Sequence, residues 1–170
     1  MDPRRSTVLN CLGYHAWASQ QILDSVEPLN QEELHRDMQA SHSSVWGTLE
    51  HCYKADQVWL SRFKGVATAK LSDYDAPEDL ATLRGEWADV QTELSEWAES
   101  RPDDAWTHMM DYRLMNGTEC SSPVYENLLH VVNHGTFHRG QVVTMLRQLG
   151  ASPIPTDFVL YVRTAMQSGF

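Results

Sequence analysis

The sequence predicts an all-α protein, a four-helix bundle with a small β-hairpin before the fourth long helix. Four long stretches repeat apolar side chains at steps of three and four residues, the period of an amphipathic helix. Short to medium connections separate these stretches, and one strong hairpin signal interrupts them before the last. We find no internal repeat and no interdomain linker, so residues 1–170 are expected to form a single domain.

The composition excludes several classes of function. With 23 acidic against 13 basic residues, the formal net charge of -10 disfavours nucleic acid as a partner. No apolar run is long enough to span a bilayer, and the N-terminus does not resemble a signal peptide, so we expect a cytoplasmic protein with no membrane partner. The scattered Cys11, Cys52 and Cys120 fit reduced thiols rather than a disulfide framework.

The first two helices are predicted over residues 6–26 and 45–64. Glu27-Pro28 ends the first, and Ser43-Ser44 offers N-caps for the second. Residues 29–42 are polar and are expected to be a connection containing a short helical turn. The inward-facing stripe of the first helix consists of Val8, Leu12, His15, Ser19 and Ile22. That of the second helix consists of Val45, Leu49, Cys52, Asp56, Trp59 and Phe63. Both stripes are mainly apolar but include polar residues.

The third helix should open with Pro77-Glu78-Asp79 and stop at Arg101-Pro102. Residues 106–114 change to a strand-like composition, and Asn116-Gly117 predicts a two-residue hairpin loop. Ser122 as N-cap and Pro123 at the first helical position should open the fourth long helix, which ends at Gly150. Residues 157–167 fit a short terminal helix.

The fourth long helix carries His130, His134 and His138, spaced one helical turn apart on an apolar side that is expected to face inward. Two histidines at i and i+4 can share a metal ion, and His51, predicted to face inward on the second helix, is the best third ligand. By spacing alone His130 with His134 is an equally good pair, and Cys52, which lies beside His51 in the sequence, is a possible thiolate ligand.

Three ligands from the protein leave a position open for water or substrate, which is typical of catalytic sites. Residue 135 is Gly rather than Glu, so the helix is not the HExxH helix of zinc peptidases. Gly135 and Gly140 lack side chains on either side of His138, which indicates that another helix or a ligand approaches this helix closely. The alternative is that the two glycines only allow tight packing of helices. Asn133 or Glu50 is expected to orient a ligand imidazole, and Arg139 and Gln141 to tie helices together.

The run HVVNHGTFHRGQ at residues 130–141 resembles the signature of the DinB superfamily of DinB/YfiT-like proteins. Residues 14–18, YHAWA, are similar to the family's Tyr-Asn-x-Trp-Ala pattern, with His15 where the family often has Asn. This departure leaves His15 open as a fourth, weaker contact to the metal. Residues 49–51, LEH, agree as well. The resemblance implies an up-down-down-up bundle, often a homodimer, with a divalent metal held by His51, His134 and His138, and it makes His130 a neighbour rather than a ligand.

Relatives of known activity are thiol-dependent, so the resemblance implies an S-transferase or isomerase that uses a low-molecular-weight thiol such as bacillithiol, mycothiol or glutathione. We therefore expect a metal-dependent transferase or hydrolase that activates a thiol or a water, acting on a small-molecule substrate. Zinc and nickel are the first candidates for the metal, and iron, manganese and copper also suit the ligands. The alternative is a non-catalytic bundle with a structural metal or a small-ligand sensor, whose pocket walls would include Trp17, Trp46 and Trp59.

Overall fold

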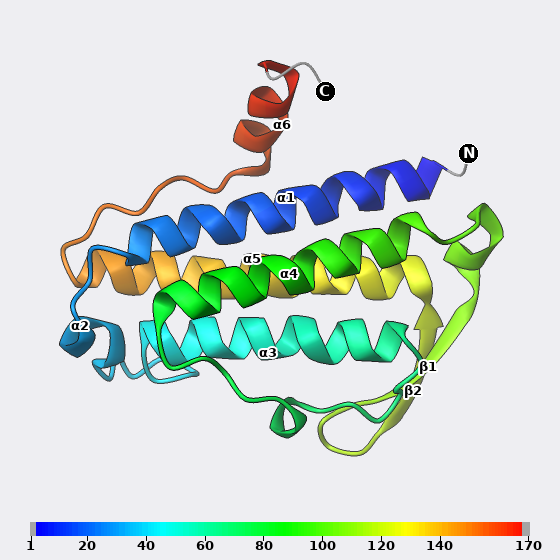
Figure 1. Ribbon diagram of the computed structural model, residues 1–170, viewed down its shortest axis with the longest axis horizontal. Coiled ribbons are helices and arrows are strands. Elements are labelled where there is room, and N and C mark those ends of the chain that lie inside the picture. The colour runs from blue at the N-terminus through cyan, green and yellow to red at the C-terminus, as the bar shows by residue number, and fades with distance from the viewer. Residues whose placement is uncertain (1–2, 168–170) are drawn as a thin grey trace.

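The computed structural model describes residues 3–167, a mostly helical chain with one β-hairpin (Figure 1). The long helices of this described part are α1 (Pro3–Val26), α3 (Val45–Phe63), α4 (Leu80–Glu99) and α5 (Val124–Gln148). The shorter elements are α2 (Gln31–His35), η1 (Leu71–Asp73), η2 (Asp103–Thr107), β1 (Met109–Arg113), β2 (Glu119–Pro123) and α6 (Phe158–Gln167).

The four long helices form a bundle in which α1 and α3 each pack against both α4 and α5. Figure 1 shows α1 and α5 running in one direction along the bundle while α3 and α4 run in the other. This is the up-down-down-up order, and the hairpin precedes α5. The predicted fold class is thereby confirmed.

The apolar core consists of two clusters, one towards each end of the bundle. The cluster at the hairpin end contains Trp59, Trp106 and Leu128, and the cluster at the α2 end contains Leu49 and Trp87. Polar and charged residues are buried where α3 and α5 pass from one cluster to the other. The functional residues described below lie at this break in the apolar core.

The structure corrects the predicted boundaries around the hairpin. Trp106, predicted to begin the strand region, lies in η2 and is completely buried. Ser122 pairs with Met110 in the hairpin, and Pro123 occupies the N-cap of α5 instead of its first helical position. Cross-strand pairing, which local sequence does not report, therefore delays the start of the helix.

Turn and cap chemistry accounts for two further differences. The strands are joined by residues 114–118, where Leu114 N–H donates to Thr118 C=O over 2.8 Å, so Asn116-Gly117 lies inside a longer loop than the two residues predicted. Helix α4 begins after Asp79, whose side chain accepts from Thr82 N–H. Because the Asp79 carboxylate caps the helix by accepting from a free backbone N–H, α4 starts at Leu80 and Pro77 lies outside it.

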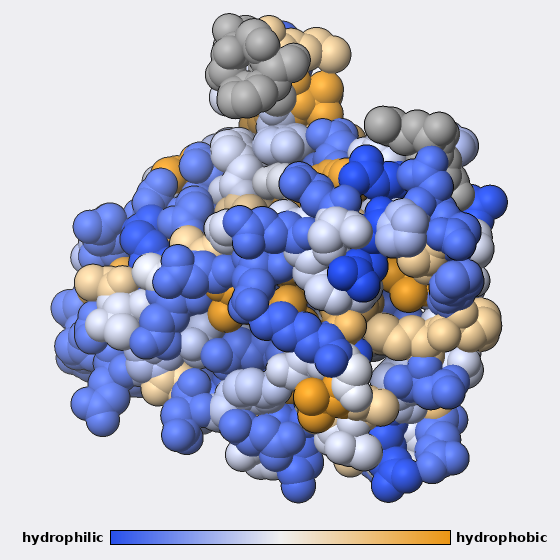
Figure 2. Space-filling view, turned by 45° about the vertical axis from the view of Figure 1, so that its right-hand side comes forward, coloured by the Kyte–Doolittle hydropathy of each residue, from blue (hydrophilic) through white to orange (hydrophobic). Residues whose placement is uncertain are grey.

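The surface in Figure 2 is mostly hydrophilic on the face shown, as the acidic composition leads one to expect. The main exception is α6, which projects from the bundle (Figure 1) and exposes Val159 and Met166. The segment before α6 is attached through Tyr14, whose hydroxyl donates to Thr156 C=O over 2.9 Å. None of the helices within residues 3–167 combines the length and apolarity needed to cross a bilayer.

The two glycines of α5 have different surroundings. A Cβ at Gly135 would lie 2.6 Å from Nδ1 of His15 on α1, closer than a carbon–nitrogen contact permits. A Cβ at Gly140 would meet nothing within 4 Å. Only Gly135 is therefore required by the close approach of a neighbouring helix.

We expect Gly135→Ala to lower the free energy of unfolding by about 1–3 kcal/mol, because the added methyl group overpacks a tightly bonded imidazole. The matched change Gly140→Ala should leave stability unchanged or raise it by up to about 1 kcal/mol, since alanine favours helix and nothing obstructs it. Urea unfolding followed by circular dichroism measures both. A Gly135→Ala protein as stable as Gly140→Ala would contradict this account of the packing.

Candidate metal centre

The structure brings together the three histidines proposed as ligands. His51 comes from α3, and His134 and His138 come from successive turns of α5. Nε2 of His134 lies 3.1 Å from Nε2 of His51 and 3.1 Å from Nε2 of His138. The i, i+4 spacing aligns the two α5 imidazoles, and the packing of α3 against α5 supplies the third.

Burial keeps the imidazoles of His51 and His134 neutral. Desolvation, with smaller contributions from His42, His134 and His138, lowers the pKa of His51 to about 3. Desolvation followed by the charge of His138 lowers the pKa of His134 to about 4. At neutral pH the rings of His51 and His134 are therefore unprotonated and keep lone pairs for a metal ion.

Gln141 fixes which nitrogen of His138 carries the lone pair. Nδ1 of His138 lies 2.7 Å from Oε1 of Gln141. A carboxamide oxygen only accepts hydrogen bonds, so Nδ1 carries the proton and donates, leaving Nε2 free towards His134. This orienting role was expected of Glu50 or Asn133. Glu50 instead accepts from Lys54 Nζ over 2.7 Å, and Asn133 is exposed.

The spacing of His134 from His51 and from His138 fits a shared divalent metal. Imidazole nitrogens bind zinc at about 2.0–2.1 Å, so nitrogens sharing one ion lie about 3–4 Å apart. The two 3.1 Å separations at His134 agree with that spacing. The histidines are therefore positioned to bind a metal ion. Neutral imidazole is a ligand for zinc, nickel, copper and iron alike, so these ligands do not identify the metal.

A fourth histidine, His42, joins the cluster from the segment that the sequence predicts to be a connection. His42 lies just before α3, and its ring stacks on that of His51 with centroids 3.9 Å apart and planes 16° apart. His42, His51 and His138 each offer a nitrogen within 4.8 Å of the others. His42 belongs to no helical period shared with the other histidines, so the sequence pattern contained no signal for it.

His130 and Cys52 are not members of the cluster. His130 is exposed rather than inward, with its ring 5.0 Å from Trp59 and 5.9 Å from the ring of His134. Burial, reinforced by the charge of Asp56, raises the pKa of the Cys52 thiol. A buried thiol held in its protonated form is a poor metal ligand.

His15 is committed to a buried network instead of the cluster. Its Nε2 lies 2.9 Å from Oδ2 of Asp56, and its Nδ1 lies 3.0 Å from Nη1 of Arg139. Because a guanidinium only donates, Nδ1 accepts from Arg139 and Nε2–H donates to the carboxylate. Both nitrogens are used, so His15 is not free to bind a metal.

Asp56 is stabilised as a carboxylate despite complete burial. Desolvation alone would raise its pKa, but the electrostatic interaction and hydrogen bond with His15, together with hydrogen bonds from Trp87 and Gln91, outweigh that effect and lower it. Nε1 of Trp87 donates to Oδ2 over 2.7 Å. The network therefore holds a buried charge between α1, α3, α4 and α5.

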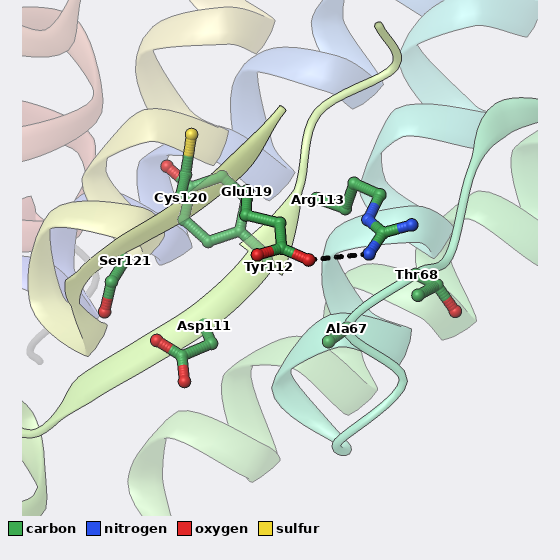
Figure 3. Close-up of a pocket in the computed structure, with 8 residues that line it drawn as sticks. All are labelled: Ala67, Thr68, Asp111, Tyr112, Arg113, Glu119, Cys120 and Ser121. Atoms are coloured by element: carbon green, nitrogen blue, oxygen red, sulfur yellow. Dashed lines mark hydrogen bonds and ion pairs between the residues drawn. The ribbon is translucent and has the colours of Figure 1, made fainter. Parts of the chain in front are cut away.

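Two cavities differ in their relation to the histidines. The larger, of about 480 Å³, lies beside the hairpin, where Arg113 and Glu119 form an ion pair across 2.7 Å (Figure 3). None of its lining residues is a histidine. The other, of about 410 Å³, borders the cluster and is lined by His42, Ser43, Gly47, Glu50, His51, Lys54, Leu71 and Ser72. Of these two cavities, only the second is therefore bordered by histidines of the cluster, His42 and His51.

Comparison with known proteins places the chain in a family. The model of the DinB family matches residues 5–169. Protein DinB of Bacillus subtilis (strain 168) is 32% identical over 166 residues, covering 88% of this chain and 90% of its own. The crystal structure of a DinB-like protein from Bacillus cereus ATCC 10987 is similar, with a TM-score of 0.69, 25% identity, and coverage of 87% of this chain and 94% of that one. A DinB-like protein from Bacillus subtilis shares the fold, with a TM-score of 0.63 and 13% identity over 88% of this chain and 96% of its own. This chain belongs to the DinB family.

Proposed function

We propose that this protein is a metal-dependent enzyme in which His51, His134 and His138 hold a divalent ion that activates a water or a low-molecular-weight thiol. The observation that carries the proposal is the convergence of three Nε2 atoms from α3 and α5. Either His15 or Cys52 as a fourth ligand would have favoured a closed structural site, but His15 is bonded to Asp56 and Arg139, and burial raises the pKa of the Cys52 thiol. The homodimer and the identity of the thiol stay predictions.

The chemistry follows from the ligands and their surroundings. A divalent ion in this site would act as a Lewis acid and lower the pKa of a water or thiol beside it to near neutrality. The chain itself holds His138 with the correct tautomer through Gln141 and keeps the imidazoles desolvated. In a transferase reaction the thiol loses its proton to solvent, its sulfur forms a bond to an electrophilic carbon, and the leaving group departs with the electron pair of the broken bond.

The adjoining cavity favours a small, polar substrate. Its volume of about 410 Å³ is at the lower end of the range for small-molecule sites. Ser43, Ser72 and the Lys54–Glu50 ion pair supply hydrogen-bonding groups along its wall. Nickel and zinc remain our first candidates for the metal.

Metal content should depend on the three proposed ligands. Protein purified without a histidine tag should contain close to one equivalent of metal by mass spectrometry, and His51→Ala, His134→Ala and His138→Ala should each lose most of it. His130→Ala is the matched control, because it removes an imidazole from the same helix outside the cluster. Stoichiometric metal in all four variants would reject the proposed ligands.

Gln141 should contribute to metal affinity without touching the ion. Gln141→Leu removes the acceptor for His138 Nδ1, and loss of such an orienting partner typically weakens metal binding by about 10- to 100-fold. Gln141→Glu keeps an acceptor oxygen and should retain most of the affinity. Competition with a chelator measures the dissociation constants, and equal values for the two variants would exclude an orienting role.

Catalysis itself is tested with metal-loaded protein. We expect turnover of an electrophile such as 1-chloro-2,4-dinitrobenzene with bacillithiol, mycothiol or glutathione, or hydrolysis of an activated ester. The rate should fall to the uncatalysed level in His138→Ala and be kept in His130→Ala. Metal-loaded protein that turns over neither class of substrate would favour the non-catalytic bundle.

A further inference from the structure

The segment before α3 places an additional histidine against the proposed metal centre. The ring of His42 stacks on His51 and lies 5.2 Å from the ring of His138. With these two residues it forms a triad of nitrogens within 4.8 Å of one another. The cluster therefore contains two overlapping triads that share His51 and His138 and differ in whether the third member is His134 or His42.

The backbone around His42 is built to hold it there. Gln39 and Ser43 both adopt positive φ angles, of 54° and 63°, which non-glycine residues rarely take. Met38 N–H donates to Ser43 C=O over 2.7 Å and closes the loop. Such backbone conformations persist only where the surrounding structure requires them, and they are concentrated at functional sites.

Gly47 on the first turn of α3 allows the loop to approach this closely. A Cβ at this position would collide with the backbone carbonyl oxygen of His42. Ser44 caps the same turn by accepting from Gly47 N–H over 3.0 Å. The loop and the first turn of α3 are therefore in close contact at Gly47, beside the position from which His42 faces His51 and His138.

We propose that His42 is a fourth, loop-borne ligand of the ion held by His51, His134 and His138. This inference rests on the proposed metal binding and adds to it a residue that the helical signature does not contain. Nitrogens that share an ion lie within about 4 Å of each other, so the 4.8 Å limit leaves only a small movement of His42 towards an ion held by His51 and His138. Because two parallel stacked rings do not direct their lone pairs at one point, His42 must tilt out of its stack on His51 to bind.

The site therefore has two arrangements. In the one seen here, His42 stacks on His51 and the cavity of about 410 Å³ is open to the cluster. In the other, His42 binds the ion and closes the position that a substrate would take. This change requires only rotation of the His42 side chain, while the backbone of its loop stays packed against α3.

The test uses the full-length, zinc-loaded protein and two variants that remove the imidazole, His42→Ala and His42→Gln, the second of which keeps most of the volume. X-ray absorption should show four imidazoles around zinc in the wild type and three in each variant. The zinc dissociation constant from chelator competition should rise by at least about tenfold, since even partners outside the coordination sphere contribute about that much. His35→Ala is the matched control, because it removes an exposed imidazole from α2 in the same part of the chain.

The outcomes separate this inference from the proposed function. A wild type with three imidazoles, or variants with unchanged imidazole count and affinity, would overturn the role of His42 and leave the triad intact. A loss of affinity in His35→Ala equal to that in His42→Ala would also overturn it, by showing that the loop is merely disturbed. A wild type that binds no zinc would reject the metal centre as a whole.

Discussion

The rest of the structure depends on satisfying one buried carboxylate, Asp56. This side chain on α3 accepts from His15 on α1 and from Trp87 and Gln91 on α4, and His15 in turn accepts from Arg139 on α5. All four long helices therefore contribute to one buried network. Breaking a buried ionic network by removing a partner costs about 3–5 kcal/mol, because a charge is left without compensation. The network thus favours a single arrangement of the helices over other apolar packings.

That arrangement determines where the proposed ligands meet. His51 precedes Asp56 by little more than one helical turn on α3, and His138 adjoins Arg139 on α5. Holding Asp56 and Arg139 to the same imidazole of His15 therefore also fixes how the two ligand-bearing helices face each other. The closeness of His15 to α5 depends in turn on Gly135. The metal centre and the buried network are neighbouring parts of the same break in the apolar core.

Most of the fold could be predicted from the sequence because each long helix shows its own apolar period. The errors lie where a partner distant in sequence decides the local structure. Ser122 has the chemistry of an N-cap but is paired with Met110, and Trp106 has the composition of a strand but fills the core from η2. Asn116-Gly117 marks the turn correctly, yet the strand pairing sets a longer loop.

The sequence by itself determined the helices, their order and the alignment of His134 with His138, because an i, i+4 spacing on a helix fixes which side chains share a face. Helical spacing left His130 open as a ligand, and the tertiary structure places it outside the cluster, as the family resemblance implied. Only the tertiary structure decided that Gln141 rather than Glu50 or Asn133 orients His138, and that His42 joins from a loop. These outcomes depend on the rotation of each helix against its neighbours and on contacts between distant segments. The helical period of the sequence does not indicate either the rotation of a helix or its contacts with distant segments.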